Sequence, residues 1–129
     1  MSITITKMFK FDAAHHLPHY VGKCHNQHGH TFHVEVEVSG KVQGKGSEAG
    51  MIIDFNNLKT IVNGAVIDLV DHTNLNLWYA NPTAENMVGV FAQDIQEGLN
   101  RQYLDDDVIV LERLRLYETE DSYAEWRRE

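Results

Sequence analysis

The sequence is poor in cysteine, in long apolar segments and in positive charge, and each shortage excludes a class of protein. Cys24 is the only cysteine among 129 residues, so no disulfide can form within the chain. No apolar run approaches the ~20 residues that span a bilayer, and no charged-then-apolar secretion signal opens the sequence. We therefore expect a cytoplasmic protein with no membrane partner.

Cations are scarce as well. Eleven Lys and Arg residues stand against 19 Asp and Glu residues, which gives a formal net charge of −8. A nucleic-acid binder needs clustered Lys and Arg to neutralise phosphates, so nucleic acid is not an expected partner. A small anionic substrate needs only a few cations in one pocket and stays compatible with this composition.

Length and pattern indicate one domain over residues 1–129. Typical domains hold about 100–150 residues, and a chain of this size buries roughly two-thirds of its unfolded surface without disulfides. The sequence contains no internal repeat, low-complexity tract or interdomain linker.

Two segments show the alternation of half-buried strands. The first runs from Ile3 to His15 and the second from about Phe32 to Ser39. The apolar parities are Ile3, Ile5, Phe9, Phe11, Ala13 and His15 in the first, and Phe32, Val34, Val36 and Val38 in the second.

Two helices are expected after a glycine-rich turn at residues 40–50. Asp54 or Asn56 offers an N-cap for the first helix, which runs to about residue 70, and Thr83 caps the second. Their apolar stripes are Phe55, Leu58, Ile61, Val62, Val66, Leu69 and Val70, and Met87, Val90, Phe91, Ile95 and Leu99. Residues 71–82 are expected to form a loop.

Two further strands are expected at about residues 108–118 and 122–127. Glu118 shares a face with Leu114 and Leu116 in the first of them. The order ββααββ predicts an α+β domain with an antiparallel four-stranded sheet and two helices on one face.

Histidine is the concentrated residue. Seven of eight histidines fall within residues 15–33: His15, His16, His19, His25, His28, His30 and His33. His28 and His30 lie two apart on the parity of Phe32, and His15 ends the apolar face of the preceding strand. If the two strands pair, three imidazoles converge, which predicts a zinc site with an open fourth position.

Two alternatives remain for these residues. The three histidines could be core or loop residues that bind no metal. The other four, His16, His19, His25 and His33, lie on other parities or in the loop, and we expect them to be exposed or to support the ligands. A closed structural zinc site that includes Cys24 would also be possible, although its spacing does not match common zinc fingers.

Several motifs recur here in one order along nearly the whole chain. They are Phe11-Asp12-Ala13-Ala14-His15, Cys24-His25-Asn26-Gln27-His28-Gly29-His30, Met51-Ile52-Ile53-Asp54-Phe55, Leu69-Val70-Asp71-His72, Asn81-Pro82-Thr83-Ala84-Glu85 and Tyr117-Glu118-Thr119. Together they resemble the 6-pyruvoyl-tetrahydropterin synthase family. The spacing from Cys24 to His28 is most similar to its bacterial branch, the 6-carboxytetrahydropterin synthases of queuosine biosynthesis.

The resemblance implies roles for residues outside the histidine set. Its zinc ligands fall on His15, His28 and His30, its catalytic cysteine on Cys24, its catalytic aspartate and histidine on Asp71 and His72, and its pterin-anchoring glutamate on Glu118. It also implies the tunnelling fold, whose subunits assemble into sheet barrels, usually as hexamers built from two trimers.

The implied reaction converts 7,8-dihydroneopterin triphosphate to 6-carboxytetrahydropterin, acetaldehyde and triphosphate. A pyruvoyl-forming synthase, an aldolase that cleaves the pterin side chain, and a non-catalytic zinc- or pterin-binding module remain alternatives. His16 stands where some relatives have arginine, and Asp12 where glutamate is common. The residues that bind the triphosphate therefore stay unassigned.

Overall fold

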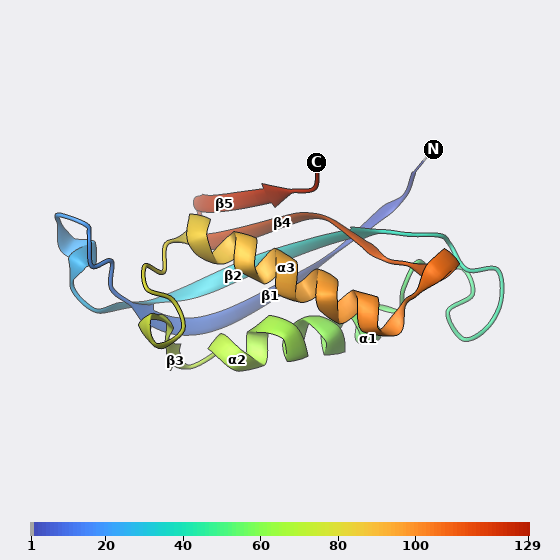
Figure 1. The fold of residues 1–129 in the computed structure, drawn as a ribbon, viewed down its shortest axis with the longest axis horizontal. Coiled ribbons are helices and arrows are strands. Elements are labelled where there is room, and N and C mark those ends of the chain that lie inside the picture. The colour runs from blue at the N-terminus through green and yellow to red at the C-terminus, as the bar shows by residue number, and fades with distance from the viewer. Residues whose placement is uncertain (1) are drawn as a thin grey trace.

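The computed structural model describes residues 2–129, which form one sheet with helices on one of its faces (Figure 1). The long strands are β1 (Thr4–His15), β2 (His28–Ser39), β4 (Val110–Thr119) and β5 (Ser122–Arg127), and each pairs antiparallel with its neighbour. The strand order is β3-β1-β2-β4-β5. The predicted α+β class and the one-sided helix layer are confirmed.

The fifth strand corrects the prediction of a four-stranded antiparallel sheet with a loop at residues 71–82. β3 (Thr73–Asn74) pairs parallel with β1 through Ala13 and Ala14, and the 3-10 turn η3 (Leu75–Leu77) follows it. A two-residue strand shows no sequence period. It forms because the chain returns along β1, where the main-chain N–H of His72 donates to the Asp12 carbonyl at 2.6 Å.

The first predicted helix consists of three consecutive segments rather than one regular helix. They are α1 (Phe55–Val62), the π-helical segment η2 (Asn63–Ile67) and α2 (Asp68–Val70). Asp54, and not Asn56, is the N-cap, since its carboxylate accepts the N–H of Asn56 at 2.7 Å.

The second predicted helix is α3 (Ala84–Gln102). Thr83 caps it as predicted, because its hydroxyl accepts the N–H of Asn86 at 3.1 Å. In Figure 1, α3 lies beside the α1–α2 segment, and both cross the same face of the sheet.

The core lies between these helices and the sheet. Phe11 of β1 and Phe32 of β2 stack with ring centroids 4.8 Å apart, and Phe91 of α3 meets Phe11 edge-on. Four members of the predicted apolar stripes are exposed instead: Ile3, Phe55, Leu69 and Val90. Ile3 precedes β1, and Phe55 is the first residue of α1. Leu69 is exposed although the adjacent Val70 is buried, so Leu69 lies on the outer side of the helical stretch.

The opposite face of the sheet is charged. Arg113 on β4 forms ion pairs with Glu35 and Glu37 on the neighbouring β2, at 3.2 Å and 3.4 Å. This polar face leaves the helix-covered face as the apolar side of the sheet.

One end of the molecule gathers the segments that matter below. The loop after β1, which contains the 3-10 turn η1 (Lys23–His25), lies at this end with β3 and the start of α3 (Figure 1). The glycine-rich segment 40–50 lies at the other end, and the 3-10 turn η4 (Asp105–Asp107) links α3 to β4. Among residues 2–129, no helix is long and apolar enough to cross a membrane.

Candidate functional site

Three histidines meet where β1 ends and β2 begins. His15 lies opposite His28 in the antiparallel register, and Ala13 lies opposite His30. The ring centroid of His15 lies 4.6 Å from that of His28 and 5.4 Å from that of His30. The ring centroids of His28 and His30 are 4.8 Å apart. The strand pairing that the sequence left open thus brings the three predicted imidazoles together.

The two ring nitrogens of these histidines differ in their hydrogen bonding. Nδ1 of His15 lies 2.9 Å from the Pro82 carbonyl, and Nδ1 of His28 lies 2.7 Å from the Asn26 carbonyl. A carbonyl can only accept, so each Nδ1 carries the proton and each Nε2 keeps its lone pair when the ring is neutral. The Nε2 atoms of His15, His28 and His30 are buried and have no hydrogen-bond partner within residues 2–129.

Glu118 completes this cluster from β4. Its Oε1 lies 3.2 Å from Nε2 of His15 and 3.2 Å from Nε2 of His30, although neither contact has hydrogen-bond geometry. One ligand atom from each of the four side chains lies within 4.8 Å of the others. Sequence reasoning placed Glu118 on the buried parity but did not place it beside the histidines.

The charges in the cluster influence one another. The contact with His15 lowers the pKa of Glu118 in spite of its burial. Burial lowers the pKa of His15, but Glu118 and the Pro82 carbonyl outweigh burial and raise it overall. Burial also lowers the pKa of His30, which the Glu118 carboxylate offsets only in part.

The donor set fits a metal cation. Three unpartnered imidazole nitrogens beside a carboxylate would be costly in a buried site, and a cation satisfies all of them at once. Histidine nitrogen with one carboxylate oxygen is a donor set that Zn²⁺ takes. These four residues therefore form a possible metal site.

A second polar cluster consists of Asp12 on β1 and of Asp71 and His72, which directly precede β3. Nδ1 of His72 is 3.0 Å from Oδ1 of Asp71, and the same oxygen accepts the main-chain N–H of Asp12 at 3.0 Å. That hydrogen bond from Asp12 is the main cause of a lowered pKa for Asp71. His72 has a positive φ of 60°, which is uncommon for a residue other than glycine.

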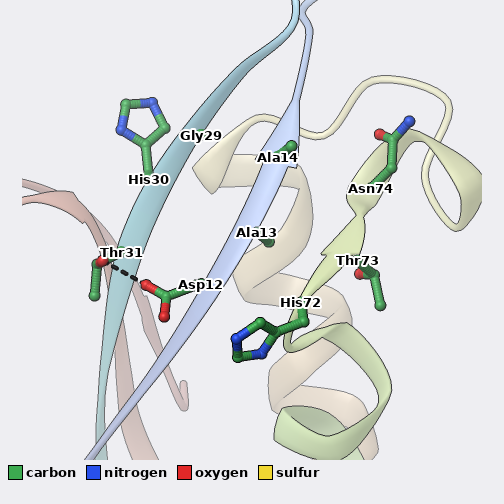
Figure 2. A pocket seen from close by; sticks show the side chains of 9 residues that line it. All are labelled: Asp12, Ala13, Ala14, Gly29, His30, Thr31, His72, Thr73 and Asn74. Atoms are coloured by element: carbon green, nitrogen blue, oxygen red, sulfur yellow. Dashed lines mark hydrogen bonds between the residues drawn. The ribbon is translucent and has the colours of Figure 1, made fainter.

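Figure 2 shows the hollow around this second cluster, an open cavity of about 640 Å³. Asp12 and Thr31 stand side by side on β1 and β2, and the hydroxyl of Thr31 donates to Asp12. The His72 ring extends beside Asp12 and Thr31. The His30 ring projects from β2 in the direction away from the His72 ring. Ala14 and Gly29, which pair across the two strands, add little side-chain bulk, so the hollow stays open.

Cys24 lies apart from both clusters. It is half-buried in η1, and its carbonyl accepts the N–H of Leu17 at 2.8 Å. In the described part of the chain, its thiol makes no hydrogen bond. The thiol belongs neither to the cluster of His15, His28, His30 and Glu118 nor to that of Asp12, Asp71 and His72. Among residues 2–129 of one chain, Cys24 therefore forms neither a hydrogen bond nor a shared ligand cluster with Asp71 and His72.

The other histidines occupy varied positions. His19 and His25 are exposed in the loop, and His33 projects from β2 on the face opposite the metal cluster. His16 is half-buried, with Nδ1 3.3 Å from the side-chain oxygen of Gln27. None of these four belongs to the cluster formed by His15, His28, His30 and Glu118.

The sequence matches a known protein family over nearly its whole length. A sequence model described as 6-pyruvoyl tetrahydropterin synthase matches residues 4–129. The chain belongs to the 6-pyruvoyl tetrahydropterin synthase family. The predicted resemblance is confirmed, and because the family is one of synthases, so is the interpretation of the chain as an enzyme.

Individual members of the family show how far the likeness extends. A Synechocystis protein named 6-carboxy-5,6,7,8-tetrahydropterin synthase is 41% identical over 74% of this chain and 77% of its own length. A Pyrococcus furiosus protein named dihydroneopterin monophosphate aldolase is 38% identical over 92% of this chain and 91% of its own.

A solved structure of the same family shares the fold. The 6-pyruvoyl tetrahydropterin synthase of Caenorhabditis elegans superposes with a TM-score of 0.80 over 100% of this chain and 97% of its own, at 23% sequence identity. The fold of this chain is therefore that of the family, the tunnelling fold.

Proposed function

We propose that the protein converts 7,8-dihydroneopterin triphosphate to 6-carboxy-5,6,7,8-tetrahydropterin, acetaldehyde and triphosphate, as a step of queuosine biosynthesis. The observation that carries the proposal is the convergence of three buried, unpartnered Nε2 atoms beside the Glu118 carboxylate. Family membership and the name of the Synechocystis relative support the choice of a pterin substrate and a carboxylated product.

His15, His28 and His30 would hold Zn²⁺ through their Nε2 atoms, and Zn²⁺ would supply Lewis-acid polarisation of the oxygens on the substrate side chain. The hydrogen bonds from Nδ1 of His15 and His28 to carbonyls fix the orientation of both rings before the metal arrives. This prior order is what a catalytic metal site requires.

The chain also supplies groups that move protons and bind the pterin. Asp71 holds Nδ1 of His72, which leaves Nε2 as the atom that exchanges a proton with the substrate. Cys24 would provide the second proton-transfer group. Glu118, a carboxylate acceptor, would take hydrogen bonds from the pterin amino group and ring N–H.

Cys24 and His72 do not meet within one chain, so we propose that the complete pocket forms between subunits. The outer edge of β5 and most of the outer edge of β1 carry no strand partner among the described residues. Open edges favour pairing with other chains, and closure into a ring removes them. A hexamer built from two trimeric barrels is the assembly that we propose.

A second candidate is cleavage of the side chain of a dihydroneopterin phosphate without formation of a carboxylate. The Pyrococcus furiosus protein named dihydroneopterin monophosphate aldolase raises this possibility, because it is 38% identical over 92% of this chain. A pyruvoyl-forming reaction is the third possibility that the family name raises.

The test is incubation of the zinc-loaded protein with dihydroneopterin triphosphate, followed by mass spectrometry of the pterin and trapping of released aldehyde. A carboxylated pterin with acetaldehyde would support the proposal. A cleaved side chain without carboxylate or acetaldehyde would identify an aldolase, and a retained three-carbon side chain a pyruvoyl synthase. A protein that binds zinc and pterin but turns over neither substrate nor analogue would be a binding module.

A further inference from the structure

The side chain of Asn76 pairs with the main chain of His16 at two points. Its Oδ1 accepts the N–H of His16 at 2.9 Å, and its Nδ2 donates to the carbonyl of His16 at 3.0 Å. A carboxamide used in this way replaces the peptide group of a neighbouring strand. The pairing continues the β1–β3 ladder beyond Ala14 and Asn74, where β3 itself ends.

Asn76 is held firmly enough to act as an anchor. Its own N–H donates to the side chain of Asn74 at 3.1 Å, and the neighbouring Leu75 is fully buried in the core. Thr73, on the same segment, donates its hydroxyl to the Val70 carbonyl at 2.6 Å. The segment that presents the carboxamide is therefore fixed independently of His16.

The residue that Asn76 holds lies next to the metal cluster on both strands. His16 directly follows His15, and its ring lies 3.3 Å from the side chain of Gln27, which directly precedes His28. His15 and His28 are the last pair of the β1–β2 register, and the contact between His16 and Gln27 joins the two chain segments just beyond it. Movement at His16 would be passed to two of the three histidines.

The same segment carries the proton-transfer pair at its other end. Asp71 accepts the N–H of Asp12, and His72 donates its N–H to the carbonyl of Asp12. Residues 71–76 are thus fastened to residues 12–16 at both ends, with the β3 pairing between them.

We infer that Asn76 is a positioning residue: it holds the chain at His16 so that His15 and His28 keep the geometry for metal binding, and it links this geometry to the segment that carries Asp71 and His72. The inference rests on the proposed metal site. It adds a residue that touches neither the metal nor the substrate but determines how the ligands are presented.

The test compares Asn76→Ala and Asn76→Asp with the wild-type protein. Zn²⁺ affinity is measured by competition with a chromophoric chelator, and the visible absorption of the Co²⁺-loaded protein reports the geometry of the ligands. We expect Asn76→Ala to lower Zn²⁺ affinity up to about 10-fold and to alter the Co²⁺ spectrum. The loss lies at the lower end of that seen when a direct partner of a ligand is removed, because Asn76 acts through the main chain of His16. Asn76→Asp keeps the acceptor for the His16 N–H and is expected to lie between the two.

Two controls separate this inference from general stability and from the proposed site itself. Asn57→Ala removes another carboxamide, on α1, whose contacts are with Glu48 and Tyr103, and should leave Zn²⁺ affinity and the Co²⁺ spectrum unchanged. Thermal unfolding of each metal-free variant shows how much stability is lost. An Asn76→Ala protein that unfolds earlier but binds Zn²⁺ and Co²⁺ as the wild type does would overturn the inference. Unaltered Zn²⁺ binding in His28→Ala/His30→Ala would instead overturn the proposed metal site.

Discussion

Oε1 of Glu118 lies 3.2 Å from Nε2 of His15, although 103 positions separate the two residues in the sequence. The carboxylate reaches the metal cluster because β4 runs beside β2, which in turn runs beside β1. Glu118 therefore stands where it can contact a bound metal, a bound pterin, or both.

Replacement of Glu118 distinguishes these roles. We expect Glu118→Ala to weaken pterin binding about 10- to 100-fold, since charged hydrogen bonds are lost, while one zinc per chain is retained. Titration calorimetry with a pterin and metal analysis after dialysis measure the two effects, with Glu118→Gln as the isosteric control. Lost zinc with unchanged pterin affinity would instead make Glu118 a metal ligand.

Alanine at His15, His28 or His30 should sharply lower zinc content and abolish turnover. The reason is that each Nε2 is a donor that nothing else in the cluster replaces. His33→Ala is the matched control, because His33 lies on β2 with His28 and His30 but faces the other side of the sheet. Full zinc occupancy in the His28→Ala/His30→Ala protein would show that the metal binds elsewhere.

Cys24→Ala should retain zinc and bind pterin but lose the chemical step. Removal of one proton-transfer group typically costs about 10²- to 10⁴-fold in rate. Zinc analysis, pterin binding and single-turnover kinetics test this together. Loss of zinc in this variant would indicate that the thiol is a ligand.

Subunit mixing tests the shared pocket. Light scattering should show an assembly larger than the 14.8 kDa chain. If Cys24 and Glu118 of one pocket come from different chains, a mixture of inactive Cys24→Ala and Glu118→Ala subunits should regain activity after exchange. A fully active monomer would contradict this arrangement.

The lowered pKa of Asp71 predicts that the free energy of unfolding depends on pH. The hydrogen bond from the Asp12 N–H lowers the pKa of Asp71 below its ordinary value of 3.8, so the folded state favours the carboxylate. The stabilisation is complete above the unfolded pKa and disappears as pH falls through the folded pKa.

The measurement is the thermal midpoint of the wild type and of Asp71→Asn between pH 2.5 and 6. The wild type should be the more stable protein above about pH 4, and the difference should shrink towards zero at lower pH. Asp106→Asn, which alters an exposed carboxylate in η4, is the control. A difference that stays constant with pH would show that the charge of Asp71 does not contribute.

Much of the site could be predicted from the sequence because its elements follow local rules. The period of two in β1 and β2 is a property of the pleated chain, so it placed His15, His28 and His30 on one face before any pairing was known. Thr83 and Asp54 are caps for an equally local reason, since each hydroxyl or carboxylate bonds an N–H two or three residues later.

The remaining features depend on contacts between distant residues, which only the tertiary structure decides. β3 is too short to carry a pattern and exists because β1 offers it an edge. Phe55, Leu69 and Val90 belong to the predicted apolar stripes and yet are exposed in the packed structure. Glu118 beside His15, and Asn76 paired with His16 across 60 positions, result from the path of the chain in space. The sequence determines which chemical groups are present, but only the packed fold determines which of them come into contact.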